Sequence, residues 1–195
     1  LKSVSFPSNS KLKKIDNSAF FDSSIESISL PASVEYIADY CFLSTPNLCK
    51  IEVSAENKFF KMIDGDYIVK ESQKGSGVFD VIFLARRNLE SITIPSRIKV
   101  INCFAFYQCK QIKSISFEPN SSLELIKKYA FYDNSPETII LPPSLKKVNK
   151  GSFYGNRNLI YVEFLSKSIK IKNNCFVSGQ NISTIIFSNA DQIVF

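Results

Sequence analysis

The 195-residue chain has no histidine, no tryptophan and a single methionine. Without histidine it cannot form a Ser-His-Asp or Cys-His catalytic group, or a His-ligated metal site, from its own residues. A P-loop, a CxxC motif and a convincing pair of catalytic carboxylates are also missing, which removes the common nucleotide, zinc-ribbon and redox signatures. We therefore expect a protein that is not an enzyme and that uses no cofactor or metal.

Long apolar runs are missing as well. The longest extend over only a few residues, whereas a transmembrane helix needs about 20. The formal charge is +6, from 24 basic and 18 acidic residues, and 45% of the residues are hydrophobic, which indicates a globular chain. No signal peptide is visible. The chain begins at Leu1 within a strand motif and ends at Phe195 before a repeat is complete. Because neither end resembles a polar cap, we interpret the chain as a fragment of a longer protein.

The strongest feature that is present is an internal repeat. A short strand motif recurs at intervals of 23 or 24 residues, with one interval of 41. The motif begins at Leu1, Ile25, Leu48, Leu89, Ile112, Pro136, Leu159 and Ile182. Periods of this length are typical of solenoids, in which each repeat packs against its neighbours. The sequence therefore predicts a single solenoid over residues 1–195, with about eight repeats of stacked parallel strands.

Each repeat has two halves. In the first half, inward apolar residues alternate with outward ones, as Ile92 and Ile94 do around Thr93, and a proline such as Pro95 ends the strand. In the second half, an aliphatic residue precedes a phenylalanine by five positions, with a small residue just before the ring. These triplets are Ile15–Ala19–Phe20, Ile37–Cys41–Phe42, Ile101–Ala105–Phe106, Ile126–Ala130–Phe131, Val148–Ser152–Phe153 and Ile171–Cys175–Phe176. We expect a second short strand, a helical or 3₁₀ turn, and six phenylalanines stacked as the spine of the core.

The 41-residue interval makes residues 54–88 an irregular repeat. Within it, Asp64-Gly65 separates two apolar stretches, and Asp-Gly between strand-like segments is a strong hairpin signal. We therefore expect a β-hairpin excursion from the solenoid. Asp64 and Asp66 could suggest calcium, but the other ligands of an EF-hand loop are missing. Turn chemistry is the better interpretation of these two carboxylates.

These motifs resemble the BspA-like leucine-rich repeat family, also called the Treponema pallidum type. Its repeat combines a strand, a proline, a second strand and an Ala-Phe turn, with a longer variant and a recurring interlude. The segments that match are 89–95 with Ile101 and Ala105-Phe106, 8–10 with Leu12, 120–122 with Leu123, and 63–65. The resemblance covers nearly the whole chain. It implies a leucine-rich repeat solenoid that is β-rich, although the class is called α/β by convention.

The resemblance also implies a function. Members of the family are surface-exposed or secreted proteins of mucosal bacteria or parasitic protists, and are associated with adhesion to host cells, matrix proteins or other microbes. The chain is thus expected at the cell surface or in secreted form, as a protein-binding module in host–pathogen interaction. The family supplies no catalytic residues. The alternative is a structural spacer, whose repeats only carry another functional domain.

The first candidate contact surface lies on the outward side of the first strands. Most positions there are serine or threonine, but Ile140, Tyr161 and Ile186 would form an exposed apolar cluster edged by Glu163. Exposed apolar patches mark contact sites, and tyrosine is an effective anchor. The cluster is a candidate site for a protein or glycan on a host or microbial surface. The alternative is that further repeats or a covering segment pack on it.

The second candidate surface is a stripe of lysines around the second strands. It includes Lys146, Lys147 and Lys170, and its remaining members are Lys13, Lys14, Lys99, Lys127, Lys128, Lys150 and Lys172. Such a stripe would attract anionic glycans, acidic proteins or nucleic acid. Nucleic acid is the least expected of these, because the aromatic residues that would stack on bases belong to the core. The alternative is a solvated lysine face with no ligand.

The five cysteines do not form a recognisable metal or redox motif. Cys41 and Cys175 occupy the small position beside a core phenylalanine, so we expect buried thiols that act as small apolar residues. The odd number excludes complete pairing within the chain. Free thiols are the simplest expectation, and the state of Cys49, Cys103 and Cys109 stays open.

Overall fold

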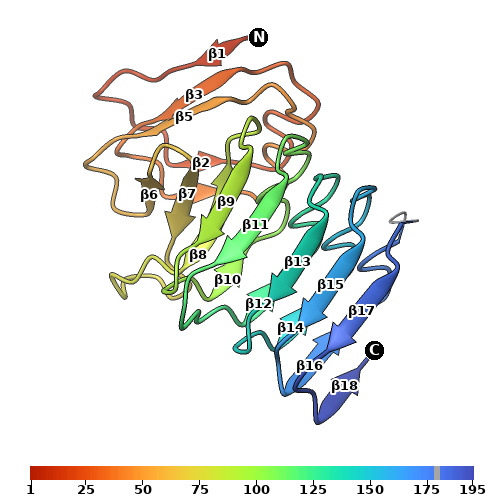
Figure 1. Cartoon of the computed structure of the whole chain (residues 1–195). Coiled ribbons are helices and arrows are strands. Elements are labelled where there is room, and N and C mark those ends of the chain that lie inside the picture. The colour runs from red at the N-terminus through yellow and green to blue at the C-terminus, as the bar shows by residue number, and fades with distance from the viewer. Residues whose placement is uncertain (178–180) are drawn as a thin grey trace.

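The computed structural model describes residues 1–177 and 181–195. Over these residues the chain winds as a solenoid of about eight coils, made of strands and turns without a helix (Figure 1). The predicted β-rich solenoid of stacked parallel strands is confirmed. No helix among the described residues has the length and apolar character needed to span a membrane.

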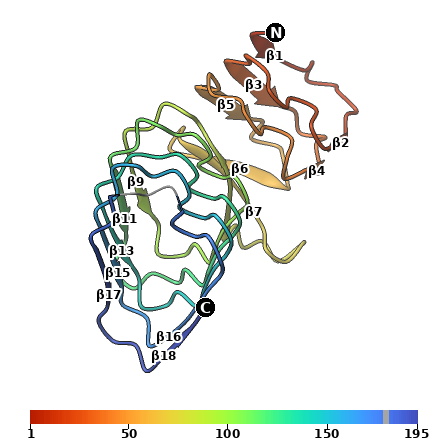
Figure 2. The same ribbon diagram turned by 90° about the vertical axis from the view of Figure 1, so that its right-hand side faces the viewer.

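Each regular coil contributes two strands, which lie on opposite walls of a flattened loop (Figure 2). The first strands are β1 (Ser3–Val4), β3 (Ser27–Leu30), β5 (Lys50–Val53), β9 (Ser91–Ile94), β11 (Ser114–Phe117), β13 (Thr138–Leu141), β15 (Tyr161–Phe164) and β17 (Thr184–Phe187). The second strands are β2 (Lys14–Ile15), β4 (Tyr36–Ile37), β10 (Val100–Ile101), β12 (Leu125–Ile126), β14 (Lys147–Val148), β16 (Ser168–Ile171) and β18 (Gln192–Val194). Equivalent positions pair in parallel, for example Ser27 with Ser3 and Lys50.

The turn after each second strand differs in detail from the expected helical or 3₁₀ turn. It contains single i→i−3 hydrogen bonds, such as the one from the Tyr132 N–H to the Tyr129 carbonyl at 3.3 Å. In four of these turns two residues four positions apart have left-handed backbone angles, as at Tyr129 and Asp133 (φ 55° at both). A helix needs consecutive right-handed residues. The left-handed pair therefore stops the helix and turns the core phenylalanine inward.

The predicted hairpin is present. Strands β6 (Phe60–Ile63) and β7 (Tyr67–Lys70) pair antiparallel, and the three residues Asp64, Gly65 and Asp66 connect them, with φ of 52° at Asp64 and 74° at Gly65. Positive φ at both residues is the mark of a type I′ turn, which the Asp66 N–H closes by donating to the Ile63 carbonyl at 2.9 Å. Strand β8 (Val81–Ala85) then pairs antiparallel with β7 and parallel with β10. The hairpin therefore continues the wall of second strands.

The hairpin sheet lies inside the molecule, between two blocks of coils (Figure 2). One side of it, including Ile68 and Phe83, packs into a core formed by the coils before the hairpin. The other side, including Val69 and Ile82, packs into the core of the coils that follow. Every residue of β8 is buried. The excursion thus forms a partition with a core on each face.

The partition also divides the phenylalanine spine. Phe20 and Phe42 stack with ring centroids 5.2 Å apart in the first block. In the second block the rings stack at 4.9, 5.4 and 5.4 Å, with interplanar angles of 3–5°, in the order Phe106, Phe131, Phe153 and Phe176. The six predicted phenylalanines therefore form two stacks of two and four rings, separated where β8 enters.

Arg87, just after β8, joins the two blocks. Only 3% of this residue is exposed, and its guanidinium donates from Nη1 to the Ala105 carbonyl (3.2 Å) and from Nη2 to the Phe42 carbonyl (3.4 Å). Between regular coils a backbone N–H fills such a position, as from Phe106 to the Ala130 carbonyl at 2.8 Å. The Ala105 carbonyl also accepts from the Ala85 N–H at 2.9 Å, and the Phe42 carbonyl from the Thr45 hydroxyl at 2.7 Å. The arginine side chain therefore adds a second hydrogen bond to each carbonyl and links the two blocks.

Candidate functional site

The structure brings the four predicted residues of the first surface together. Ile140, Glu163 and Ile186 are direct neighbours across β13, β15 and β17, and Tyr161 lies on the same face of β15. The two isoleucines are 48% and 38% exposed. We call Ile140, Tyr161, Glu163 and Ile186 the sheet patch. It combines solvent-facing apolar area with one fixed carboxylate, and its role in binding stays a prediction.

The carboxylate of Glu163 is held by two hydroxyl groups. Tyr161 donates from Oη to Oε2 at 2.9 Å, and Ser188 donates to Oε1. The bond from Ser188, followed by that from Tyr161, lowers the pKa of Glu163. The same contact raises the pKa of Tyr161, because the phenol must keep its proton to donate. The patch therefore presents a negative charge and an oriented tyrosine ring side by side.

The second strands lie on the wall opposite the sheet patch (Figure 2), and the predicted lysines are on these strands or within two residues of them in sequence. Lys147 and Lys170 are adjacent in register on β14 and β16. Lys146 precedes β14 and makes an ion pair of 3.0 Å with Glu124. Lys13 likewise makes an ion pair of 3.1 Å with Glu35. Three of the ten lysines, Lys13, Lys99 and Lys146, are thus paired with acidic side chains. The other seven, including the neighbours Lys147 and Lys170, make no ion pair within the described part of the chain.

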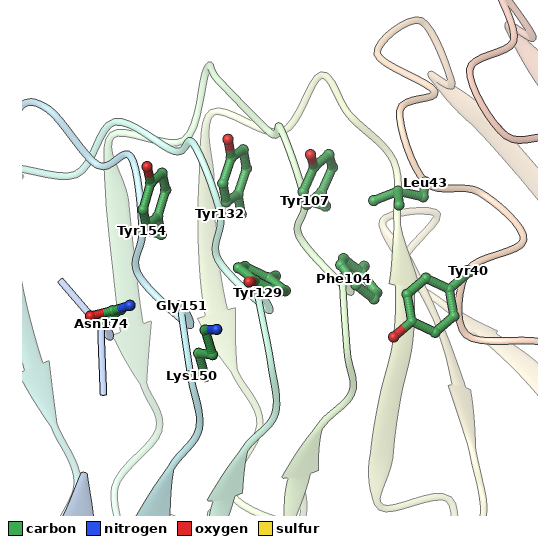
Figure 3. Close-up of a pocket in the computed structure, with 10 residues that line it drawn as sticks. All are labelled: Tyr40, Leu43, Phe104, Tyr107, Tyr129, Tyr132, Lys150, Gly151, Tyr154 and Asn174. Atoms are coloured by element: carbon green, nitrogen blue, oxygen red, sulfur yellow. The ribbon is translucent and has the colours of Figure 1, made fainter. Parts of the chain in front are cut away.

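A third surface is a groove lined by aromatic side chains, which the sequence reasoning had assigned no role. It encloses about 540 Å³ and runs across the turns of successive coils (Figure 3). We call it the aromatic groove; its lining residues are Tyr40, Leu43, Phe104, Tyr107, Tyr129, Tyr132, Lys150, Gly151, Tyr154 and Asn174. The signal was present in the sequence, because three of the tyrosines directly follow a core phenylalanine at Phe106, Phe131 and Phe153.

Two rows of rings form the walls of the aromatic groove (Figure 3). In one row Tyr132 stacks on Tyr107 at 4.6 Å and on Tyr154 at 5.3 Å, with interplanar angles of 11° and 2°. In the other row Phe104 stacks on Tyr129 at 5.7 Å. The rows meet edge to face, with Tyr129 and Tyr132 at 6.0 Å and 73°. Because the faces within each row are already stacked, ring edges and the aligned tyrosine hydroxyls remain for a ligand.

Comparison with protein families decides the identity of the repeat. The model of the BspA type leucine rich repeat region matches residues 1–64 and 79–194, in six copies. The chain belongs to this family. The match confirms the resemblance carried by the strand, proline and Ala-Phe motifs, and covers both blocks of coils around the partition. Comparison with curated proteins gives no match.

Solved structures of leucine-rich repeat proteins share the fold of this BspA-type chain. A leucine-rich repeat protein from Eubacterium ventriosum is similar over 100% of the chain, with a TM-score of 0.82 and 19% identity. The pneumococcal vaccine antigen PcpA is similar over 100% of the chain, with a TM-score of 0.78 and 22% identity. A leucine rich cell surface protein from Faecalibacterium prausnitzii is similar over 98% of the chain, with a TM-score of 0.60 and 16% identity. The chain spans only 54%, 55% and 61% of those proteins.

The aromatic groove contains two strained residues of the BspA-type turn. Phe104 and Tyr129 have φ of 61° and 55°, a left-handed conformation that costs a bulky L-residue about 1–2 kcal/mol. Other coils place Ser18, Gly151 or Asn174 at the equivalent position, and glycine and asparagine accept this conformation at lower cost. Large rings therefore occupy this position in three coils, at Tyr40, Phe104 and Tyr129. All three line the groove, and Phe104 and Tyr129 have a positive φ.

The cysteines of the BspA-type chain are all free thiols. Cys41 and Cys175 are buried beside core phenylalanines, as predicted. Burial raises the pKa of Cys41 to about 12 and that of Cys175 to about 11. Cys109 is also buried, and Cys49 is exposed. Among the described residues, no group of three or more His, Cys, Asp or Glu side chains is placed to hold a metal ion.

Proposed function

We propose that this BspA-type chain is a non-enzymatic binding module of a surface-exposed or secreted protein, and that it adheres to host cells, extracellular matrix or other microbes. The observation that carries the proposal is the sheet patch. Ile140 and Ile186 flank the oriented Tyr161–Glu163 pair on an otherwise polar sheet. Support also comes from the similar structures, one of which is called a cell surface protein and another a vaccine antigen.

The rest of the sheet face explains why the patch is the expected contact point. Elsewhere the outward side chains satisfy one another, as Thr93 and Ser116 do through their hydroxyls at 2.8 Å. Lys50 and Glu52 form an ion pair of 2.8 Å on the same face. Groups that are already paired gain little from a partner, because the partner must replace existing bonds. The two isoleucines have no such alternative, and their burial favours binding.

The proposed partner is a protein or a glycan on a host or microbial surface. The two kinds of partner would use different surfaces of the chain. Lys147 and Lys170 would add an attraction to anionic glycans that is screened by salt. The sheet patch would instead bind mainly through apolar contact, which salt does not weaken. Salt dependence therefore distinguishes the two surfaces.

The test is a binding screen of the chain against immobilised matrix proteins, glycosaminoglycans and host cells at several salt concentrations. Tyr161→Ala should weaken binding about tenfold, the effect of losing an interface anchor, while Tyr36→Ala, a matched change at an exposed tyrosine on β4, should not. A glycosaminoglycan ligand should be lost on reversing Lys146, Lys147 and Lys170, but not on reversing Lys11, Lys58 and Lys113. Failure of every ligand class to bind would overturn the proposal.

A structural spacer is the second candidate function, and the paired side chains of the sheet favour it. On the face of the first strands, Thr93 pairs with Ser116 and Lys50 with Glu52, so these side chains already satisfy one another. A spacer predicts that the chain binds none of the screened surfaces, and that a longer protein containing it binds equally well when other repeats replace it. Binding by the chain alone, abolished by Tyr161→Ala, would exclude this candidate.

A further inference from the structure

We propose that the aromatic groove binds a proline-rich peptide segment of a partner protein, held as a polyproline II helix that lies along the solenoid axis and continues into acidic residues. This site is separate from the sheet patch, and the proposal does not depend on it. It rests on the spacing of the rings, the hydroxyl groups beside them, the backbone strain at the groove and the charge at its edge.

The spacing of the rings fits this helix. Tyr107 and Tyr154 are two steps apart in a stack with spacings of 4.6 and 5.3 Å. A polyproline II helix rises about 3.1 Å per residue with three residues per turn, so its equivalent residues recur at about 9.3 Å, close to two ring steps. An extended strand places same-face residues about 6.6 Å apart, which matches neither one step nor two. The groove therefore selects the polyproline period.

The tyrosine hydroxyls supply the polar contacts that such a ligand needs. The carbonyl groups of a polyproline II helix have no internal hydrogen bonds, and proline offers no N–H, so the ligand requires donors alone. The hydroxyls of Tyr107, Tyr132 and Tyr154 point the same way along one side of the groove (Figure 3). Tyrosine hydroxyls carry their proton at neutral pH and can donate; burial raises the pKa of Tyr107 and of Tyr132 further. The ring edges provide the apolar surface for the proline rings.

The strain at Phe104 and Tyr129 is a separate indication of a binding role. Outliers of this kind persist where the surrounding structure holds them, and they cluster at ligand clamps. Both rings pack edge to face against the row of tyrosines, with ring centroids 5.7 Å apart for Phe104 and Tyr107 and 6.0 Å apart for Tyr129 and Tyr132. They are already ordered by stacking, so little side-chain entropy is lost when a ligand binds.

Charge at the edge of the groove favours acidic residues next to the prolines. Lys150 lines the groove, and Lys128 stands at the equivalent position one coil earlier. Both side chains are exposed, and neither takes part in an ion pair among the described residues. The nearest acidic residue of the tyrosine row, Asp133, is paired with Lys110 at 3.4 Å. The open edge of the groove is therefore positive.

The test measures binding of a fluorescent proline-rich peptide of roughly ten residues, ended by two glutamates, to the chain by polarisation. The control is a Gly/Ser peptide of equal length with the same glutamates. We expect the proline-rich peptide to bind at least about tenfold more tightly. Equal affinity for the two peptides, or preference for a neutral oligosaccharide over the proline-rich peptide, would overturn the proposal.

Two sets of variants locate the site. Removing both hydroxyls with Tyr132→Phe and Tyr154→Phe keeps the stack, and should weaken binding about fivefold or more through the lost hydrogen bonds. Tyr36→Phe removes an exposed hydroxyl outside the groove and should leave affinity unchanged. Reversing Lys128 and Lys150 should weaken binding most at low salt. If the groove variants bind like the unchanged chain, the peptide binds elsewhere and the assignment is wrong.

Discussion

Gly151 lies directly against the ring of Tyr129: a Cβ atom at position 151 would be 2.3 Å from Cε1 of that ring. The glycine also has φ of +66°, which disfavours other residues. Because Gly151 has no side chain, the ring of Tyr129 can lie over it on the next coil. Gly151 also ends the row of rings that Phe104 and Tyr129 begin. One residue therefore sets both the position of Tyr129 and the open floor of the aromatic groove.

Gly151→Ala is expected to destabilise the chain by about 2–3 kcal/mol, from the left-handed backbone together with the displaced Tyr129 ring. It should also weaken binding of the proline-rich peptide. The free energy of unfolding is measured by urea denaturation. Gly75→Ala is the matched control, because Gly75 has φ of +82° with nothing within 4 Å, and it should cost only about 1 kcal/mol. Equal losses at the two positions would show that the Tyr129 contact imposes no constraint.

Arg87→Ala should cost about 2–4 kcal/mol, because it removes a buried side chain whose guanidinium links the Phe42 and Ala105 carbonyl groups, and it leaves a cavity between the blocks. Arg97→Ala removes the same side chain from an exposed site and should change stability by less than about 0.5 kcal/mol. Thermal unfolding of the two variants provides the comparison. A loss at Arg87 no larger than that at Arg97 would contradict the bridging role.

Phe83→Ala and Ile82→Ala probe the two faces of the partition. Phe83 belongs to the core before the hairpin and Ile82 to the core after it. Phe83→Ala should lower the free energy of unfolding by about 3–5 kcal/mol, and Ile82→Ala by about 2–5 kcal/mol. Val78→Ala, at an exposed site nearby, is the control. Circular dichroism and tyrosine fluorescence should report one shared transition in both variants, because β8 couples the blocks. Two separate transitions would show that the blocks unfold independently.

Thiol reactivity should follow burial. At pH 8 a thiol reagent should modify the exposed Cys49 fastest and the buried Cys41 and Cys175 slowest, because only thiolates react. The raised pKa of Cys41 also has a consequence for stability. The contribution of the protonated Cys41 thiol to the free energy of unfolding is complete below the ordinary thiol pKa of 9.0, and it falls as the pH rises toward about 12. The free energy of unfolding, measured from pH 8 upward, should show this decline, and Cys41→Ala should make the decline smaller.

Most of the coil architecture could be predicted because the repeat fixes register. Once the motifs are aligned, residues such as Ser27 and Tyr161 fall opposite their equivalents in neighbouring coils, as the ladders confirm. Asp64-Gly65 also identified the hairpin through local turn chemistry. Its place in the molecule could not be predicted, because a continuous apolar run such as Val81–Ala85 indicates burial on both faces without identifying the coils that cover them.

The candidate sites were predictable to different degrees. Alternation along the strands placed Ile140 and Ile186 on one face, since that pattern depends only on strand geometry. The bond between Tyr161 and Glu163 depends on side-chain rotamers, which a pattern does not specify. The aromatic groove was missed because Tyr107 and Tyr132 follow core phenylalanines, and period alone does not separate a ring in the core from its neighbour on the rim.

The two unlike faces of β8 restrict how the number of coils can change during evolution. Within either block a coil meets similar coils on both sides, so deletion or duplication of one restores nearly the same contacts. Beside β8 the contacts are specific: Phe83 requires the coils before it, Ile82 those after it, and Arg87 must reach carbonyl groups of both. The repeat array can therefore lengthen or shorten within each block, while the coils adjoining the hairpin must be retained.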